Sequence, residues 1–264
     1  MTAPMMRIDD LTEENLDDVF RVCSYNRLDD PLQMEGIELK RKWLREIIEE
    51  HATCTKIAYL DEKPVAQVLY YPERIAPFLA HPREGVVILH CCYNPFKEAQ
   101  GKGVGSALLQ SLIRECREGL PILGGAPCTF LVAQPFTTGT GVPLGEFYEK
   151  NGFKQGEDEM YLEITGEYQP KRFTGYYPLP EDLGRAVMFY DSMCEWGYPF
   201  AVRVKESLRG IEPNLVVKLI DKWREPKEYI RRGGKQLLVN AKPIESFWTE
   251  KESFRREVEG ALRD

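Results

Sequence analysis

The sequence has few histidines, no excess of positive charge and no long apolar run, and each shortage excludes a class of protein. Three histidines accompany seven cysteines in 264 residues, and no Cys/His spacing matches a zinc site, so we predict no metal. Lysine and arginine (35) are outnumbered by aspartate and glutamate (42) and are scattered through both halves. The resulting net charge of −7 argues against nucleic acid as a partner, since nucleic-acid binders usually carry a basic face.

No apolar run approaches the length of a membrane span, and the N-terminus lacks a signal-peptide pattern. We therefore expect a cytoplasmic protein without membrane contact. The cysteines fit a reducing compartment, because their number is odd and most lie in apolar runs. They are predicted to be small core residues rather than a disulfide framework: Cys23, Cys54, Cys91, Cys92, Cys116, Cys128 and Cys194.

What is present is a soluble globular composition, with 43% hydrophobic and 29% charged residues, and a length that suits two modest domains. Hydrophobic periodicity predicts a mixed α/β first half. Its expected elements are a strand at 6–8, a helix opened by Thr12, a helix at 37–51, a hairpin at 56–71, an apolar strand at 86–92, a helix from 107 and a strand at 129–133.

A glycine-rich stretch, Gln100 to Ser106, lies between the apolar strand and an amphipathic helix. Such a turn directs several backbone N–H groups at one spot, where an anion such as a phosphate can bind. The stretch lacks the G-K-[ST] of a P-loop and the glycine spacing of a Rossmann fingerprint. Taken alone it is also compatible with a tight turn before a core helix.

The pattern Gln100-x-x-Gly103-x-Gly105 resembles the acetyl-CoA loop of the GCN5-related N-acetyltransferase (GNAT) superfamily. A second segment, Phe147-Tyr148-Glu149-Lys150-Asn151-Gly152-Phe153, resembles the signature [F/Y]-Y-x-K-x-G-F of the same superfamily and follows in the right order. The resemblance covers roughly residues 5 to 165. It implies a GNAT acyl-CoA N-acyltransferase fold with a mixed sheet, and transfer of an acetyl group from acetyl-CoA to a small-molecule or peptide amine by direct attack.

The resemblance also implies where acetyl-CoA lies, which is a cleft between two splayed parallel strands, here 86–92 and 129–133. Backbone groups of Cys91, Cys92 and Tyr93 would hold the pantetheine arm. The pyrophosphate would bind the backbone amides of the glycine stretch, while Gln100 shapes the turn. Lys102 either adds positive charge there or is solvated. The implied cofactor residues are thus Cys91, Cys92, Tyr93, Gln100, Gly101, Lys102, Gly103, Val104, Gly105 and Ser106.

Direct attack needs a base for the amine proton and an acid for the departing thiolate. Tyr148 matches the family's position for that acid. The alternatives for this residue are positioning of the thiol and plain packing. Candidate bases are His90, whose ordinary pKa lies near neutrality, and Glu73. The alternatives are a core histidine and a solvated loop carboxylate. Cys91 and Cys92 are adjacent on a strand and point to opposite faces, so we do not expect a paired nucleophile.

The second half restarts after a Pro-, Gly- and aromatic-rich stretch, which predicts a first domain at 1–166, a linker at 167–183 and a smaller domain at 184–264. Its predicted order β-α-β-α-β-β-α resembles a thioredoxin-like domain and the YoaP-like C-terminal extension of some GNAT proteins. The predicted elements are strands at 186–190 and 215–220, helices at 199–208 and 226–232, a hairpin of 236–240 with 244–247, and a last helix capped by Thr249.

The dithiol of thioredoxins is absent, because Cys194-Glu195-Trp196-Gly197 has glycine where the second cysteine belongs. Cys194 is either a single reactive thiol near a helix N-terminus or a structural residue. Trp196, Tyr198 and Phe200 suit a surface that binds the first domain or a protein partner. Besides an amine acetyltransferase, two alternative functions therefore stay open. One is a non-catalytic CoA-binding interaction module, and the other is a redox-linked enzyme that uses Cys194.

Overall fold

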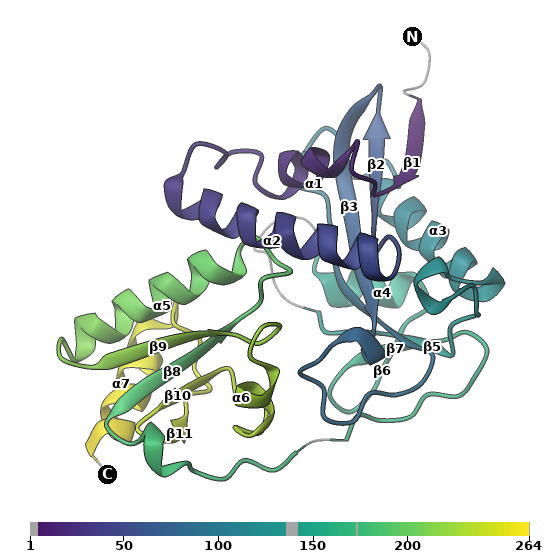
Figure 1. Cartoon of the computed structure of the whole chain (residues 1–264). Helices are drawn as coiled ribbons and strands as arrows, with labels where there is room; N and C mark the ends of the chain where they lie inside the picture. The colour runs from purple at the N-terminus through teal and green to yellow at the C-terminus, as the bar shows by residue number, and fades with distance from the viewer. Residues whose placement is uncertain (1–4, 136–141, 173, 264) are drawn as a thin grey trace. The chain divides into compact units, whose positions relative to one another are not determined.

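The structure, a computed structural model, describes residues 5–135, 142–172 and 174–263. Contacts divide the chain into two compact units (Figure 1). The first comprises residues 1–28, 41–76 and 81–172, and the second comprises residues 29–40, 77–80 and 173–264. The domain boundaries expected from the sequence stay a prediction, and residue 173 of the predicted linker lies outside the described residues.

The first unit is built on a seven-stranded sheet with the order β1-β2-β3-β4-β5-β7-β6. Strands β4 and β5 run parallel and all other neighbours run antiparallel. The strands are β1 (Met6–Asp10), β2 (Thr55–Leu60), β3 (Lys63–Pro72), β4 (Val86–Tyr93), β5 (Phe130–Ala133), β6 (Lys154–Gln155) and β7 (Met160–Glu163). The predicted hairpin and both predicted inner strands are therefore confirmed.

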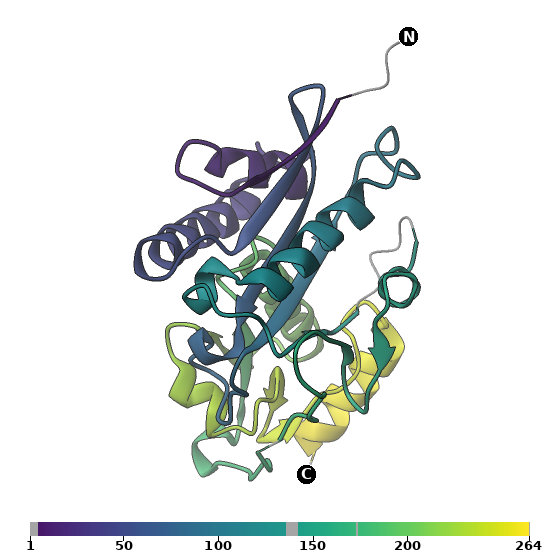
Figure 2. The same ribbon diagram turned by 90° about the vertical axis from the view of Figure 1, so that its right-hand side faces the viewer.

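Helices cover both faces of this sheet (Figure 2). Helix α1 and the second half of α2 lie on one face and α3 lies on the other, where it buries Leu108, Leu112 and Cys116. The elements are α1 (Leu16–Cys23), α2 (Pro31–Glu50), α3 (Val104–Glu118), α4 (Leu144–Lys150) and the short 3₁₀ turns η1 (Glu73–Ile75) and η2 (Pro121–Leu123).

Two helix starts differ most from the prediction, and α3 also begins earlier, at Val104 rather than 107. Helix α1 begins at Leu16 rather than near Thr12, because the side-chain carbonyl of Asn15 accepts the backbone N–H of Thr12 at 2.7 Å and holds a turn there. Helix α2 begins at Pro31 rather than Ile37. Its start is set by Asp30, whose carboxylate accepts the N–H of Leu32 at 3.0 Å, an N-terminal cap that the apolar pattern alone does not reveal.

The second unit contains a four-stranded sheet with the order β11-β10-β8-β9. Strands β8 and β9 are parallel, and β10 is antiparallel to both β8 and β11. The elements run η3 (Pro180–Asp182), β8 (Arg185–Tyr190), α5 (Gly197–Ile211), β9 (Val216–Asp221), α6 (Pro226–Ile230), β10 (Leu237–Val239), β11 (Lys242–Pro243) and α7 (Lys251–Arg263). The predicted order of strands and helices is confirmed, whereas the thioredoxin-like assignment stays a prediction.

Two details of this unit were predicted wrongly. The second strand of the hairpin is Lys242–Pro243 rather than 244–247, because Asn240 and Ala241 take left-handed backbone conformations (φ 49° and 57°) and make a tighter turn. The last helix begins at Lys251, so Thr249 is not directly before it.

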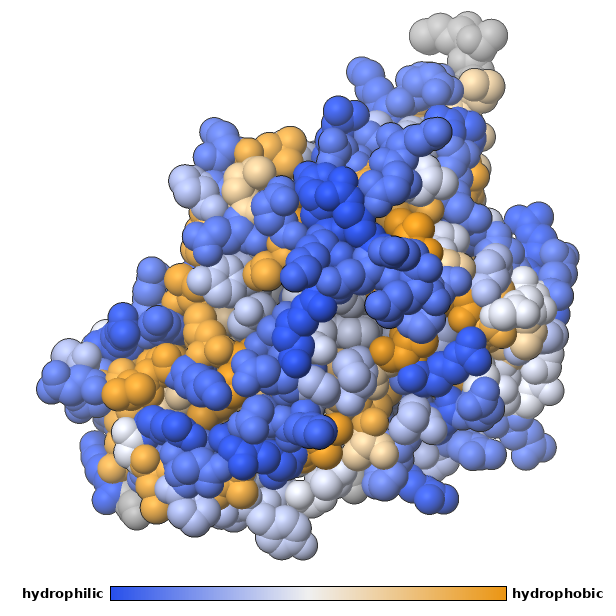
Figure 3. Space-filling model, in the orientation of Figure 1, coloured by the Kyte–Doolittle hydropathy of each residue, from blue (hydrophilic) through white to orange (hydrophobic). Residues whose placement is uncertain are grey.

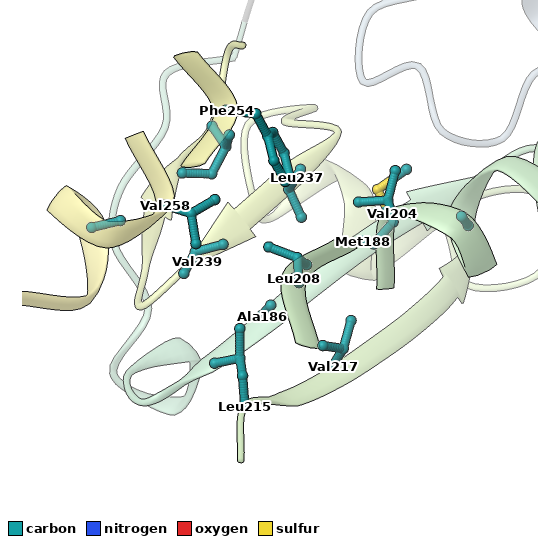
Figure 4. Packing of buried hydrophobic residues seen from close by; sticks show 13 residues of the cluster. Ala186, Met188, Val204, Leu208, Leu215, Val217, Leu237, Val239, Phe254 and Val258 are labelled. Carbon is teal, nitrogen blue, oxygen red and sulfur yellow. The ribbon is translucent and has the colours of Figure 1, made fainter. Parts of the chain in front are cut away.

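Alternation along β8 gives the second unit two apolar layers. Ala186 and Met188 face a core that α5 and α7 complete with residues such as Leu208 and Val258 (Figure 4). Val187 and Phe189 face the other side, against a cluster that Tyr229 of α6 joins. The sheet is therefore covered on both faces, as a strand that is apolar at every position requires.

Residues 29–40 and 77–80 belong to this second unit. The ring of Phe78 lies 5.2 Å from that of Trp223 and 5.9 Å from that of Tyr229. The ammonium of Lys222 lies 4.3 Å from the centre of the Phe78 ring and pairs with Asp191 at 2.7 Å. The unit is thus completed by segments that are distant in the sequence.

The face drawn in Figure 3 is mostly hydrophilic, and the hydrophobic atoms of the second unit gather over α5 and β9. Strand β9 is at an edge of its sheet, and its Val216 is 65% exposed. No helix within the described residues combines the length and apolar character needed to cross a bilayer. No disulfide joins any of the seven cysteines, all of which the structure describes.

Candidate functional site

The parallel strands β4 and β5 separate at their carboxyl ends. Their pairing begins at Val86 with Phe130 and ends at Leu89 with Ala133, whereas β4 continues to Tyr93. On its other side β4 stays paired to β3 up to Gln67 and Tyr93. The backbone of the last residues of β4 therefore has a partner strand on one side only.

A β-bulge accompanies this separation. Leu69 of β3 pairs with Cys91 and Tyr70 pairs with Leu89, so His90 is the extra residue of β4. A bulge bends its strand and redirects the side chains beyond it. Cys91 and Cys92 follow the bulge and pair in regular register with Leu69 and Val68, as expected for neighbours that point to opposite faces of the sheet.

The glycine stretch turns from β4 into α3. Gly101 and Gly103 have φ values of +72° and +77°, a left-handed region that side-chain-bearing residues avoid. Gly103 is the N-cap of α3, and the first intrahelical hydrogen bond runs from the N–H of Ala107 to its carbonyl at 2.9 Å. Helix geometry leaves the N–H groups of residues 104–106 without an intrahelical acceptor. An anion is favoured at such an end.

A pocket of about 410 Å³ opens at this end of α3. Among the residues predicted for the cofactor, it is lined by Cys92, Tyr93, Gln100, Gly101, Gly103, Val104, Gly105 and Ser106. Cys91 and Lys102 are not part of its lining. Gln100 donates from its side-chain amide to the carbonyl of Asn94 at 3.0 Å, which braces the turn.

The pocket has further lining residues that the sequence interpretation missed: Asn94, Ala99, Val142, Leu144, Phe147, Lys150 and Asn151. Several belong to α4, the helix of the second signature. Asn151 holds the end of α4 by donating to the carbonyl of Phe147 at 2.8 Å and accepting from Gln110 of α3 at 3.4 Å. The segment of the second signature thus contributes to the pocket lining, although the sequence interpretation assigned a site role only to Tyr148 within it.

Tyr148 lies in α4 and is 1% exposed. Its ring packs between Phe147 and Phe153, at centroid distances of 5.6 and 5.3 Å. Burial, followed by the nearby thiols of Cys92 and Cys91, raises the pKa of Tyr148 well above its ordinary value. Tyr148 does not line the pocket, but it adjoins Cys92, which does.

The two candidate bases have different surroundings. His90 occupies the bulge and is partly exposed, and its ring lies 6.4 Å from that of Tyr71. Glu73 is 1% exposed, so the alternative of a solvated loop carboxylate is wrong. It pairs with the guanidinium of Arg83 and accepts the backbone N–H of Arg83 at 2.8 Å. Arg83 also pairs with Glu159 at 2.5 Å. Neither candidate base lines the pocket.

The thiol of Cys92, which lines the pocket, is not activated. Burial, together with the neighbouring Cys91, raises the pKa of Cys92 to about 12, so this sulfur stays protonated at neutral pH. Cys92 lies 3.9 Å from the carbonyl of Gly105. A protonated thiol is a poor nucleophile.

In the second unit, Cys194 is half-buried and lies in the turn before α5, ahead of the N-cap Trp196. Tyr198 packs against Tyr190 and is hydrogen-bonded to Glu35, and Phe200 packs against Phe247 and Trp248. In the described part of the chain, no cluster of three or more His, Cys, Asp or Glu residues is arranged to hold a metal ion.

Comparisons with known proteins identify a family over about half of the chain. The model of the family described as acetyltransferase (GNAT) matches residues 14–153. A structure of a GNAT family acetyltransferase from Brucella melitensis with acetyl-CoA is 16% identical, covers 63% of this chain and 92% of that one, and has a TM-score of 0.43. A putative GNAT acetyltransferase from Desulfovibrio desulfuricans is 19% identical over 61% of this chain and 99% of that one (TM-score 0.42).

A third structure, the PaiA N-acetyltransferase of Thermoplasma acidophilum with coenzyme A, is 18% identical, covers 61% of this chain and 98% of that one, and has a TM-score of 0.39. No relative was found among curated proteins.

Proposed function

This chain belongs to the acetyltransferase (GNAT) family, and we propose that it transfers the acetyl group of acetyl-CoA to the nitrogen of a primary amine. The observation that supports this most strongly is the pocket at the N-terminus of α3, where the free end of β4 meets the glycine stretch. Acetyl-CoA supplies an activated thioester; the roles below belong to residues of the chain.

The pocket suits a ligand that has an anionic and an extended part. The N–H groups of Val104, Gly105 and Ser106 point out of α3 and would bind the pyrophosphate. The backbone of Cys92 and Tyr93, at the end of β4 beyond its pairing with β5, would hold the pantetheine arm. Such a strand edge offers donors and acceptors at regular spacing.

Tyr148 is the proposed acid for the departing thiolate. A raised pKa keeps its hydroxyl protonated throughout the pH range in which an amine acetyltransferase works, so the proton is available for transfer. We expect no loss of rate from ionisation of Tyr148 between about pH 6 and 9. Its position beside Cys92, a residue of the pocket lining, favours this role over simple packing.

The base remains a proposal with one favoured candidate. Glu73 is held in a buried ion pair with Arg83, and both of its carboxylate oxygens already accept hydrogen bonds from that residue. His90 is partly exposed in the bulge of β4, at the end of the strand pairing. We therefore favour His90.

Turnover of acetyl-CoA with a panel of amines tests the function. Wild-type protein is expected to acetylate at least one class of primary amine, and Tyr148→Phe to lower kcat by about 10²-fold or more, the size typical of a lost proton donor. Affinity for CoA is expected to stay unchanged, because the phenyl ring keeps its packing. Tyr161→Phe, on strand β7 outside the pocket lining, is the matched control.

A non-catalytic CoA-binding module is the second candidate, since the pocket by itself implies only binding. Tight CoA binding without acetylation of any amine, and without an effect of Tyr148→Phe, would establish it. The redox alternative predicts that Cys194 reacts with an alkylating reagent faster than an ordinary thiol does, and an ordinary rate rules it out.

A further inference from the structure

One polar atom beside the pocket lacks a partner. The side-chain carbonyl oxygen of Asn94 is buried and finds no hydrogen-bond donor within the described ranges of the chain. Buried polar groups in proteins are nearly always paired, because an unpaired one loses its water without compensation. An orphaned carbonyl that also borders a pocket is therefore a position where a ligand donor is expected.

Asn94 lies in the sequence between the end of β4 and the glycine stretch, both of which contribute to the pocket lining. It directly follows Tyr93, the last residue of β4. Its backbone carbonyl accepts the side-chain amide of Gln100 at 3.0 Å, which ties the residue to that turn. Asn94 lines the pocket together with Tyr93 and Gly101. Its backbone is thus tied to that turn, so only the side chain has to rotate for its buried carbonyl to meet a ligand in the pocket.

The chemistry of the ligand decides which group can pair with it. Phosphate oxygens are acceptors, and they complement the N–H groups at the start of α3 rather than a carbonyl. The pantetheine arm of CoA carries amide N–H groups and a hydroxyl, all of which can donate. Building on the proposed function, we propose that the side-chain carbonyl of Asn94 accepts a hydrogen bond from an N–H or O–H group of the pantetheine arm. Asn94 then recognises the arm, while the α3 end recognises the phosphates.

The chain offers a matched control for this contact. The side-chain carbonyl of Gln67 is also buried and has no donor within the described residues. Gln67 is on β3, paired with Tyr93, and does not line the pocket. Removal of its carbonyl tests whether any orphaned carbonyl near the end of β4 affects binding.

The experiment measures binding of two probes by calorimetry: CoA, and adenosine 3′,5′-bisphosphate, which lacks the arm. Asn94→Leu, which keeps the size of the side chain, and Asn94→Ala are compared with Gln67→Met and the wild type. We expect both Asn94 variants to bind CoA about three- to tenfold more weakly, the effect of one neutral hydrogen bond. We expect both to bind the bisphosphate as the wild type does and to unfold at an undiminished temperature.

Other outcomes overturn the proposal. Equal weakening for both probes indicates distortion of the pocket, and unchanged CoA affinity shows that the carbonyl makes no contact. If Gln67→Met loses as much affinity for CoA as Asn94→Leu does, the loss is caused by altered packing and not by a missing contact of Asn94 with the ligand. If the wild type binds neither probe, the proposed function itself fails, and that outcome is distinct from the others because it does not involve Asn94.

Discussion

Single residues of the glycine stretch have different reasons to be glycine. Gly103 has a left-handed backbone, and a Cβ placed on it meets no atom within 4 Å. Its requirement is therefore conformational. Gly105 has no positive φ, and its Cβ would lie 3.5 Å from the ring of Phe147 and 4.0 Å from the sulfur of Cys92. These are ordinary contact distances, so the protein itself has room for a methyl group there. Both neighbours line the pocket, and a methyl group between them would narrow it.

Alanine at the two positions is expected to separate these requirements. Gly103→Ala places a residue with a side chain in a left-handed backbone conformation. We expect it to lower the free energy of unfolding by about 1–2 kcal/mol. Gly105→Ala is expected to leave stability unchanged and to weaken CoA binding by about tenfold, since it narrows the pocket. Thermal unfolding and calorimetry of both variants check this. A larger stability loss in Gly105→Ala than in Gly103→Ala would contradict the assignment.

The sequence predicted residues whose role is local and missed those whose role depends on distant partners. Gly103 was predicted correctly as part of a turn into a helix because its neighbours carry the signal. Glu73 was assigned as a candidate base or a solvated loop carboxylate, because nothing near it in sequence shows that it is buried in an ion pair with Arg83, which also pairs with Glu159. Asn94 was overlooked for a similar reason, since its buried carbonyl is apparent only once the pocket around it has formed.

At the scale of elements, α2 carries the most information that the sequence did not reveal. Gln33, Gly36 and Lys40 lie on one face of this helix, at a spacing of three and four residues. All three meet Glu195: the amide of Gln33 donates to its carbonyl at 3.0 Å, and a Cβ on Gly36 would lie 2.0 Å from the same oxygen. Lys40 pairs with the carboxylate at 2.7 Å, and both side chains are at most 2% exposed.

The Lys40–Glu195 pair gives a stability prediction for this element. Lys40→Met leaves the buried carboxylate of Glu195 without its lysine partner. We expect it to lower the free energy of unfolding by about 3–5 kcal/mol. The double variant Lys40→Met/Glu195→Leu is expected to recover most of that loss, because a buried apolar pair avoids the desolvation of two charges. Lys42→Met, at an exposed position of the same helix, is the control. Denaturant unfolding measures all three, and a double variant as unstable as Lys40→Met would contradict the prediction.

At the scale of the whole molecule, element order was predictable and unit membership was not. Periodicity and glycine positions predicted the strand and helix order of the second unit, because both are read within a few residues. The assignment of residues 29–40 and 77–80 to that unit depends on contacts across more than a hundred positions, such as Phe78 with Trp223. A single boundary position in the sequence cannot define a unit that consists of three separate segments.

A shortened chain tests this membership. A fragment of residues 1–172 keeps every strand of the seven-stranded sheet but removes Glu195 from Lys40, and Trp223 and Tyr229 from Phe78. We expect its backbone amides at 29–40 and 77–80 to exchange hydrogen much faster than in the full chain, because their buried contacts are gone. Amides of β4 and the interior of α3 are expected to keep their protection and serve as the internal control. Equal protection of 29–40 in both chains would mean that this segment folds independently of residues 173–264, and loss of protection throughout would mean that the first unit does not fold without them.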